Sequence, residues 1–256
     1  MRSRFLPVIL SNADMDLSRL VPQLAGTTPV AGWAFARACR YYRARGCAAF
    51  FLTGRAESLH RDLQRSGAAY AYFISHAQDG DKVTSRADPF FDAVACGDEA
   101  GASNIARHSA QVARPDREHP EDFLYVHLLM RRFFLGATDA EAASILQNLE
   151  AAVAEGSPSQ RLDVCRALLA GDGEAFHEAL LRLIDEHRAW YETGFQKGRI
   201  PEEVWATDGC LFIEGLALLR LARAARLSTY EEYPLIPSLA LAPPRIRYED
   251  GSWLTP

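Results

Sequence analysis

Five cysteines are too few and too scattered to provide a disulfide framework for this chain of 256 residues. No two of them form a C-x-x-C pair, and an odd count leaves one cysteine unpaired in any scheme. Each lies in an apolar stretch of sequence. Buried, reduced thiols are typical of a reducing compartment, whereas disulfide-rich domains are typically secreted. The sequence therefore predicts buried, reduced cysteines and a cytoplasmic location.

An export signal and a membrane span are also missing from the sequence. Residues 1–10 are basic and then briefly apolar, but Asn12, Asp14 and Asp16 follow at once. The apolar stretch is therefore too short for the central region of a signal peptide. No run reaches the roughly 18 apolar residues of a transmembrane helix. We expect a protein that is not exported and does not contact a membrane.

The familiar motifs of catalysis and cofactor binding are absent as well. The sequence has no G-x-S-x-G, no phosphate-binding glycine loop and no dinucleotide fingerprint. His177 and His187 are ten residues apart, so they fall about 80° out of register on a helix and cannot share a metal ion. We expect no catalytic residue, no metal and no cofactor.

Residues that favour β-strands are scarce, whereas Ala, Leu and Arg are abundant and 48% of the chain is apolar. The predicted fold class is all-α. Helices are expected to be separated by glycine turns at Gly46, Gly97-Asp98 and Gly171-Asp172-Gly173. In the helix expected over residues 30–45, Trp33 is predicted to face inward, and Arg43 and Arg45 largely outward. After a break at Gly67, residues 68–78 fit either a helix or a short strand. The pattern predicts stacked antiparallel helical hairpins, as a bundle or short solenoid, in one domain over residues 1–242 with an extension over 243–256.

One apolar helix over residues 207–227 is expected to organise the rest, with Thr207 or Asp208 as its cap. Glu214 lies on its apolar face, where a carboxylate is costly unless it is paired or protonated. We interpret Glu214 as a structural acid that pairs with an arginine or with backbone N–H groups. Two prolines in Tyr233-Pro234-Leu235-Ile236-Pro237 exclude regular helix there, so this segment is predicted to form an extended cap.

Charge is unevenly distributed along the chain, whose net charge is −5. Residues 1–78 hold ten arginines against four acids, residues 79–122 hold ten acids against five bases, and the remainder has a net charge of −6. This balance argues against nucleic acid as the partner and is compatible with a basic protein. Loops carry recognition more often than core helices, so the first candidate binding patch consists of Asp79, Asp81, Asp88, Asp116, Glu118 and Glu121. The alternative patch consists of Glu178, Asp185, Glu186 and Glu192.

Four segments carry a resemblance to a known family: DPFFDAVACGD (88–98), EDFLYVHLLMRRFF (121–134), LDVCRALLAGDGEAFHEALLRLIDEH (162–187), and FIEGLALLRLA with EYPLIPSLA (212–222 and 232–240). They resemble the immunity protein 49 family of bacterial polymorphic toxin systems. The Gly-Asp turn before a Phe-bearing helix, and the apolar helix before Tyr-Pro-x-Ile-Pro, are the most specific parts. The resemblance covers most of 88–240, while residues 1–75 match only in helical character.

The resemblance implies a non-enzymatic immunity protein that binds a toxin effector, such as one delivered by type VI secretion, and blocks its catalytic domain. Without an export signal, the expected toxin acts in the cytoplasm. Two other classes stay open: a tetratricopeptide-like helical scaffold that binds peptides, although without the fixed repeat of about 34 residues, and a helical hydrolase that uses Glu214. Homodimerisation through the apolar helices is a further alternative.

Overall fold

The computed structural model describes residues 4–25, 31–154 and 159–256, which form eleven α-helices and no β-strand. This confirms the predicted all-α class. The helices are α1 (Leu6–Leu24), α2 (Gly32–Thr53), α3 (Ala56–His76), α4 (Asp88–Cys96), α5 (Glu99–His108), α6 (Pro120–Phe134), α7 (Asp139–Ala154), α8 (Gln160–Ala170), α9 (Gly173–Gln196), α10 (Glu202–Ala206) and α11 (Ile213–Ala224). Short 3-10 turns occur at Asp79–Asp81 (η1), Ser238–Leu241 (η2) and Ser252–Leu254 (η3).

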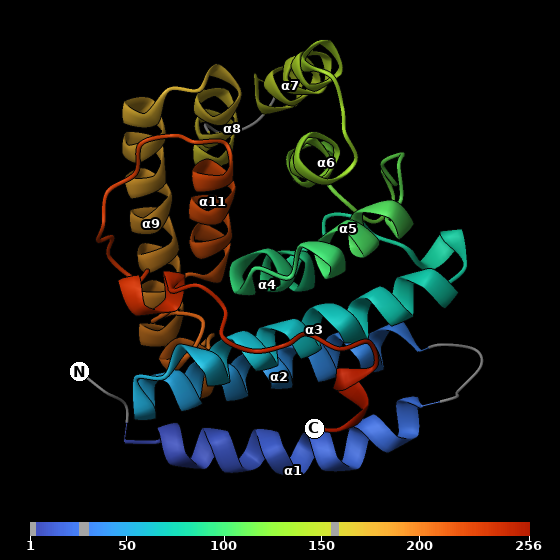
Figure 1. The fold of residues 1–256 in the computed structure, drawn as a ribbon, viewed down its shortest axis with the longest axis vertical. Helices are drawn as coiled ribbons and strands as arrows, with labels where there is room; N and C mark the ends of the chain where they lie inside the picture. The colour runs from blue at the N-terminus through green and yellow to red at the C-terminus, as the bar shows by residue number, and fades with distance from the viewer. Residues whose placement is uncertain (1–3, 26–30, 155–158) are drawn as a thin grey trace.

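The helices pack mostly against their neighbours in sequence (Figure 1). Helix α1 lies along α2, α2 along α3, and α3 against both α4 and α5. The pairs α6–α7 and α8–α9 form two further contacts between successive helices, and α11 returns beside α9 and across α4. None of the described helices combines the length and the apolar character needed to cross a bilayer.

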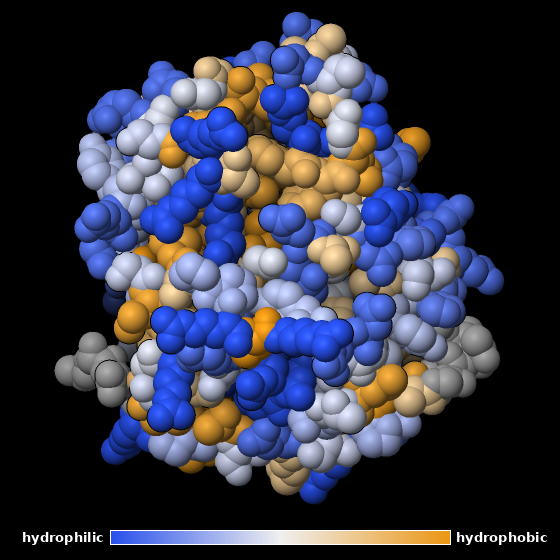
Figure 2. Space-filling view, viewed as in Figure 1, coloured by the Kyte–Doolittle hydropathy of each residue, from blue (hydrophilic) through white to orange (hydrophobic). Residues whose placement is uncertain are grey.

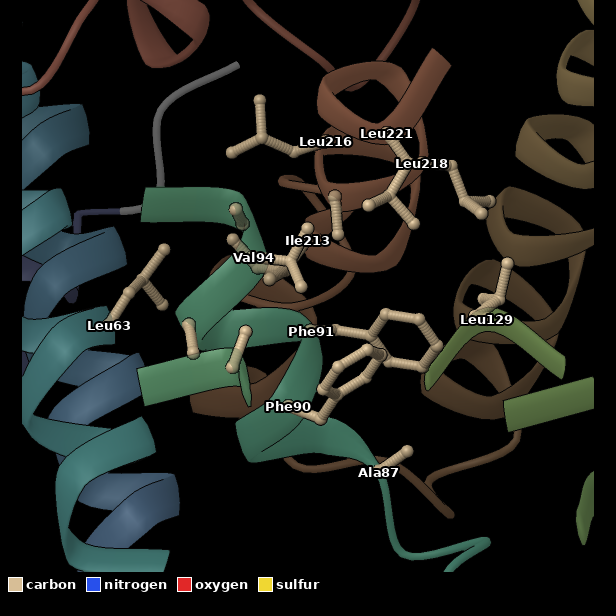
Figure 3. Packing of buried hydrophobic residues seen from close by; sticks show 14 of the residues in the cluster. Leu63, Ala87, Phe90, Phe91, Val94, Leu129, Ile213, Leu216, Leu218 and Leu221 are labelled. Atoms are coloured by element: carbon tan, nitrogen blue, oxygen red, sulfur yellow. The ribbon is translucent and has the colours of Figure 1, made fainter. Parts of the chain in front are cut away.

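Helix α4 lies at the centre of the hydrophobic core, between α3, α6 and α11 (Figure 3). Phe90 is fully buried and Phe91 nearly so. In α11, Leu216 and Leu218 are fully buried. Burying a side chain of this size contributes roughly 1.5–3 kcal/mol relative to leaving it exposed. The N-terminal ends of α4 and α11 are therefore held in place by the best-packed part of the molecule.

Helices α2 and α3 are longer than the sequence indicated, because the expected break at Gly46 is wrong. Helix α2 continues to Thr53 and ends at Gly54, whose φ of 69° suits glycine. A β-carbon at Gly46 would lie 3.0 Å from Cβ of Asp62 and 3.3 Å from the backbone oxygen of Leu59. Gly46 thus permits a close approach to α3 rather than ending a helix.

Gly67 has the same role one helix later, and the break expected there is also wrong. A β-carbon at Gly67 would lie 2.9 Å from Cβ of Ala93 in α4. Helix α3 runs through this position to His76, so the strand alternative for residues 68–78 is excluded. Tertiary packing has outweighed the low helix propensity of glycine at both sites.

Three side chains of α2 point in the opposite direction to the one predicted. Trp33 is 66% exposed rather than inward. Arg43 and Arg45 are largely buried rather than outward, because carboxylates from other helices pair with them. Arg45 donates from Nε and Nη2 to Asp62 in α3, at 2.9 and 2.6 Å, and from Nη1 to Asp14 in α1 at 3.0 Å. This cluster joins the first three helices.

Three helices begin with a side-chain cap made by residues close in the sequence. Asp98 accepts from the amide of Gly101 at 2.9 Å, and Asp172 accepts from the amide of Ala175 at 3.0 Å. Thr138 and Glu141 form a reciprocal capping box, in which each side chain accepts from the other's amide. The predicted turns at Gly97-Asp98 and Gly171-Asp172 are confirmed, with φ values of 79° and 68° at the two glycines.

The predicted helix over 207–227 is wrong at its start. Thr207 donates from Oγ1 to the carbonyl of Glu203 and thereby closes α10 instead of capping α11. Residues 207–212 turn back on themselves, and α11 begins at Ile213. The amide of Phe212 donates to the carbonyl of Leu235 at 2.9 Å, so the proline-containing segment covers the start of α11 without forming a helix.

The last residues fold back onto the helical core. Trp253 is 3% exposed and its ring lies 5.5 Å from that of Phe35. Its carbonyl accepts from the hydroxyl of Tyr42 at 2.5 Å, and Ser252 donates to the side-chain oxygen of Gln64 at 2.6 Å. Residues 243–256, expected to be an extension, therefore contribute buried contacts to α2 and α3.

All five cysteines are free, and four are buried: Cys39, Cys47, Cys96 and Cys165. Cys210 is partly exposed. Burial raises the pKa of every one of these thiols, to about 12 for Cys39 and Cys96. A thiol with so high a pKa stays protonated and unreactive while the surrounding helices remain packed.

Candidate functional site: an acidic groove beside helix α9

A groove lies where α9 faces the N-terminal ends of α4, α8 and α11. It consists of two adjoining hollows of about 440 and 240 Å³. Both hollows share six lining residues, which come from α8, α9, α11 and the turn before α11: Arg161, His187, Trp190, Tyr191, Phe212 and Glu214. The larger hollow is completed by Glu121 and Glu186, and the smaller by Arg43, Asp88 and Asp208.

Arg161 forms the first charged centre of this groove. Its Nε and Nη2 atoms donate to the two oxygens of Glu214, each at 2.9 Å, and Nη1 donates to Asp122 at 3.1 Å. Tyr125 donates to Glu214 at 2.9 Å, and its ring lies 5.0 Å from the guanidinium carbon. Burial and the neighbouring Glu214 charge raise the pKa of Tyr125 well above its usual value, so its hydroxyl remains a donor.

Glu214 is thus paired with an arginine, one of the two partners expected for it from the sequence. Its side chain is 16% exposed, and both carboxylate oxygens accept hydrogen bonds. A bidentate guanidinium pair stabilises the ionised carboxylate. The arrangement provides an anchored charge at the edge of the groove and joins α6, α8 and α11.

Arg43 forms the second charged centre, at the floor of the groove. Its Nε atom donates to Asp92 at 2.7 Å, and its Nη2 atom donates to the carbonyl of Asp88 at 2.6 Å. Nη1 lies 3.3 Å from the carboxylate of Asp88 and 3.9 Å from that of Asp208. One guanidinium therefore faces three carboxylates.

The two buried acids of this centre differ in how they are satisfied. Asp92 also accepts from the hydroxyl of Ser66 at 2.5 Å, and burial raises its pKa to about 7 against the opposing charge of Arg43. Burial raises the pKa of Asp208 to about 6, again against Arg43. Among the described residues, none donates a hydrogen bond to Oδ1 of Asp208.

Aromatic side chains of α9 form one wall of the groove. His187, Trp190 and Tyr191 follow the i, i+3, i+4 spacing of one helix face. His187 shares a hydrogen bond of 2.9 Å with the carbonyl of Asp208 through Nε2, and burial lowers its pKa. Trp190 packs edge-on against Tyr191 but is 62% exposed. An exposed indole beside a hollow is typical of a recognition surface.

The structure brings together acids from both candidate patches. Asp88 and Glu121, from the first patch, line the same groove as Glu186 from the alternative patch. The other exposed acids of the first patch lie apart from the groove: Asp79 and Asp81 in η1, and Asp116 in the loop before α6. Lys82 pairs with Asp79, and Arg117 lies near Asp81 and Asp116.

Glu118 differs from the other acids of the first patch because it is only 7% exposed. Its two oxygens accept from the amides of Ser85 and Arg114, at 2.9 and 3.1 Å. It therefore joins the two loops on either side of α4 and α5. Its main contacts are internal.

The other acids of the alternative patch are spread along the exposed side of α9. Glu178 lies 3.7 Å from Arg182, and Asp185 lies 3.1 Å from Arg188. Glu192 is exposed about one turn beyond Arg188. Surface ion pairs of this kind contribute little to stability, and Arg182 and Arg188 offset the charges of Glu178 and Asp185.

Two residues that were considered together as metal ligands are separated in the structure. His177 contacts Tyr230 and Tyr233, whereas His187 faces Asp208 and the groove. The described ranges contain no group of three or more His, Cys, Asp or Glu side chains placed to hold a metal ion.

Sequence reasoning missed Trp190, Arg43 and Arg161. The spacing of His187, Trp190 and Tyr191 was visible, but an aromatic triplet on a helix usually indicates core. Arg43 was assigned to an outward face because its partners lie 45 to 165 residues away in the sequence. No local pattern identifies pairs that are so distant.

A different kind of hollow opens on the other side of α11. It encloses about 450 Å³ and is lined mainly by apolar residues, among them Phe133 and Phe134 at the end of α6, Leu221 in α11 and Leu241 in η2. Figure 2 shows apolar side chains exposed between α11 and α6 on this face. Its lining includes Arg220, Arg223 and Glu99, so it lacks the acidic character of the groove.

Searches of curated proteins and of solved structures found no match. The sequence model of one family, Immunity protein 49, matches residues 45–240. The match begins within α2 and ends in η2, so it includes every residue of the groove except Arg43. Because it spans well over half of the chain, this protein belongs to the Immunity protein 49 family.

Proposed function

We propose that this immunity protein binds and neutralises a toxin made beside it, by covering the toxin's catalytic domain. The family match supports an immunity role. The groove supports binding, because it combines an exposed tryptophan with carboxylates that outnumber the guanidinium groups beside them. That imbalance is the observation that carries the proposal.

The proposed toxin acts in the cytoplasm and presents a basic surface, as proteins directed at nucleic acids or nucleotides do. Residues 79–122 hold ten acids against five bases and residues 123–256 have a net charge of −6, so the part of the chain that supplies all of the groove except Arg43 is negative as a whole. A negative field accelerates encounter with a basic partner and is screened by salt, with a Debye length of about 8 Å at physiological ionic strength. The association rate should therefore fall as salt is raised toward one molar.

Co-expression with the product of the neighbouring gene tests the function. The pair is examined by size exclusion with light scattering, and the growth of cells carrying both genes is compared with growth on the neighbour alone. A stoichiometric complex together with restored growth is the expected result. Separate peaks with unrelieved toxicity would contradict the proposal for that pair, and an association rate unaffected by salt would contradict the electrostatic part.

A further inference from the structure

Carboxylates around the groove exceed the positive charges that face them. Arg43 is surrounded by Asp88, Asp92 and Asp208, and Arg161 by Asp122 and Glu214. Two further acids, Glu121 and Glu186, line the larger hollow. Arg40, an exposed residue one turn before Arg43, also attracts the charge of Asp208 electrostatically. Even with Arg40 included, the groove keeps an excess of negative charge in a setting partly removed from water.

The floor of the smaller hollow is the least neutralised part. Oδ1 of Asp208 accepts no hydrogen bond from the described residues, and Nη1 of Arg43 is 3.9 Å away. Asp88 beside it is 84% exposed in its side chain. Oδ1 of Asp208 is itself buried, so a donor brought in by a partner would meet the exposed carboxylate of Asp88 and the exposed part of Asp208, whose side chain is 16% exposed.

The wall above this floor suits a planar cation. Trp190 exposes 62% of its surface and lines both hollows. A guanidinium group is planar, so it stacks on an indole face and pairs bidentately with carboxylates, whereas an ammonium group interacts with both only as a point charge. The combination of an indole wall and a carboxylate floor thus fits arginine better than lysine.

We infer that the groove is the toxin-docking surface and that it receives an arginine side chain carried on a loop of the toxin. The guanidinium lies between Trp190 and the acids at Asp88 and Asp208, while Glu121 and Glu186 contact the flanking residues of that loop. This inference rests on the proposed function and specifies where and how the partner binds.

The test measures the affinity of the purified pair for matched variants. Trp190→Ala is compared with Trp33→Ala, because Trp33 is 66% exposed on α2 and lines neither hollow. Glu186→Gln is compared with Glu231→Gln, an exposed acid outside the groove. In a Trp33→Phe background, Trp190 is the only tryptophan exposed by more than half among the described residues, so the red-shifted part of the emission, which comes from exposed indole, reports the groove.

We expect Trp190→Ala to weaken binding by at least about thirtyfold, as loss of a hot-spot aromatic does. Glu186→Gln should slow association by about threefold. Both control variants should bind as the parent does, and Trp190 emission should shift to the blue on binding. Changing one arginine of the toxin to alanine should reproduce the loss without adding to Trp190→Ala, and lysine at that position should restore only part of it.

The outcomes separate the inference from the function on which it rests. If the parent protein binds and protects but Trp190→Ala behaves like Trp33→Ala, the toxin docks elsewhere and the inference is overturned while the function stands. If lysine replaces the toxin's arginine without loss, the guanidinium assignment is wrong. If the parent neither binds nor protects against its neighbour, the function fails and the inference fails with it.

Discussion

Removing the guanidinium of Arg161 should destabilise the fold measurably. In Arg161→Ala, Glu214 would keep only the hydrogen bond from Tyr125, and its side chain is largely buried, with 16% exposed. Breaking a fully buried pair costs about 3–5 kcal/mol. Because the side chain of Arg161 is itself 35% exposed, solvent screens part of this effect, and we expect a loss of about 2 kcal/mol.

Urea unfolding at pH 7, followed by circular dichroism, measures this difference. For a chain of this size, about 2 kcal/mol corresponds to a melting temperature lower by roughly 4–8 °C. Arg182→Ala is the matched control, since Arg182 is 49% exposed and pairs with acids on the same surface. Its loss should stay within about 0.5 kcal/mol.

A double-mutant cycle with Glu214→Gln isolates the pair. Glutamine keeps the size of the side chain and can still accept from Tyr125, so the coupling energy between the two substitutions should be about 1–2 kcal/mol. Equal stabilities for Arg161→Ala and Arg182→Ala would refute the reasoning, because Glu214 would then be fully solvated without its partner. Glu214→Gln also tests the hydrolase alternative, which requires an activity that vanishes in this variant while the fold persists.

Three further predictions concern other parts of the molecule. Burial raises the pKa of Asp208 to about 6, so the folded protein holds a proton that the unfolded chain releases near pH 4. The contribution of this protonated carboxyl group to the free energy of unfolding is therefore complete below about pH 4 and is lost as the pH rises through about 6. That loss is up to about 3 kcal/mol, and urea titrations at pH 4, 5 and 8 should show a weaker pH dependence in Asp208→Asn. Trp253→Ala should cost about 3 kcal/mol in the same assay by leaving a cavity against Phe35, and an unchanged midpoint would mean that the chain end contributes nothing. Gly67→Val should lower the melting temperature, because its side chain would overlap Ala93 and overpacking costs about 1–3 kcal/mol, whereas a rise would show that α3 and α4 can separate without cost.

The sequence was informative wherever local chemistry decides the structure. Asp98, Asp172 and the pair Thr138–Glu141 cap helices through side chains three residues from the amides they bind, so composition and spacing were sufficient. The same holds for the apolar character of α4 and α11, which depends on periodicity alone.

Close helix contacts and the groove could not be obtained in this way. Gly46 looked like a helix terminator, since the helix that approaches it is specified some fifteen residues later by Leu59 and Asp62. Thr207 looked like a cap, since nothing local shows that the short helix α10, which begins at Glu202, already ends at Ala206. The groove is assembled from α2, α4, α6, α8, α9 and α11, so its residues share no sequence window, and only Asp88, Glu121 and Glu186 had been predicted to bind a partner.

The free cysteines make the protein suitable for site-resolved labelling. Cys39 and Cys47 lie in α2, Cys96 at the end of α4 and Cys165 in α8, so each reports a different contact of the core. Their buried, protonated thiols react with an alkylating reagent only when the surrounding helices open. Cys210 is partly exposed in the turn beside the groove and should react first. Mass spectrometry of alkylated peptides would therefore give an order of local unfolding, and protection of Cys210 by a bound toxin would report occupancy without any engineered probe.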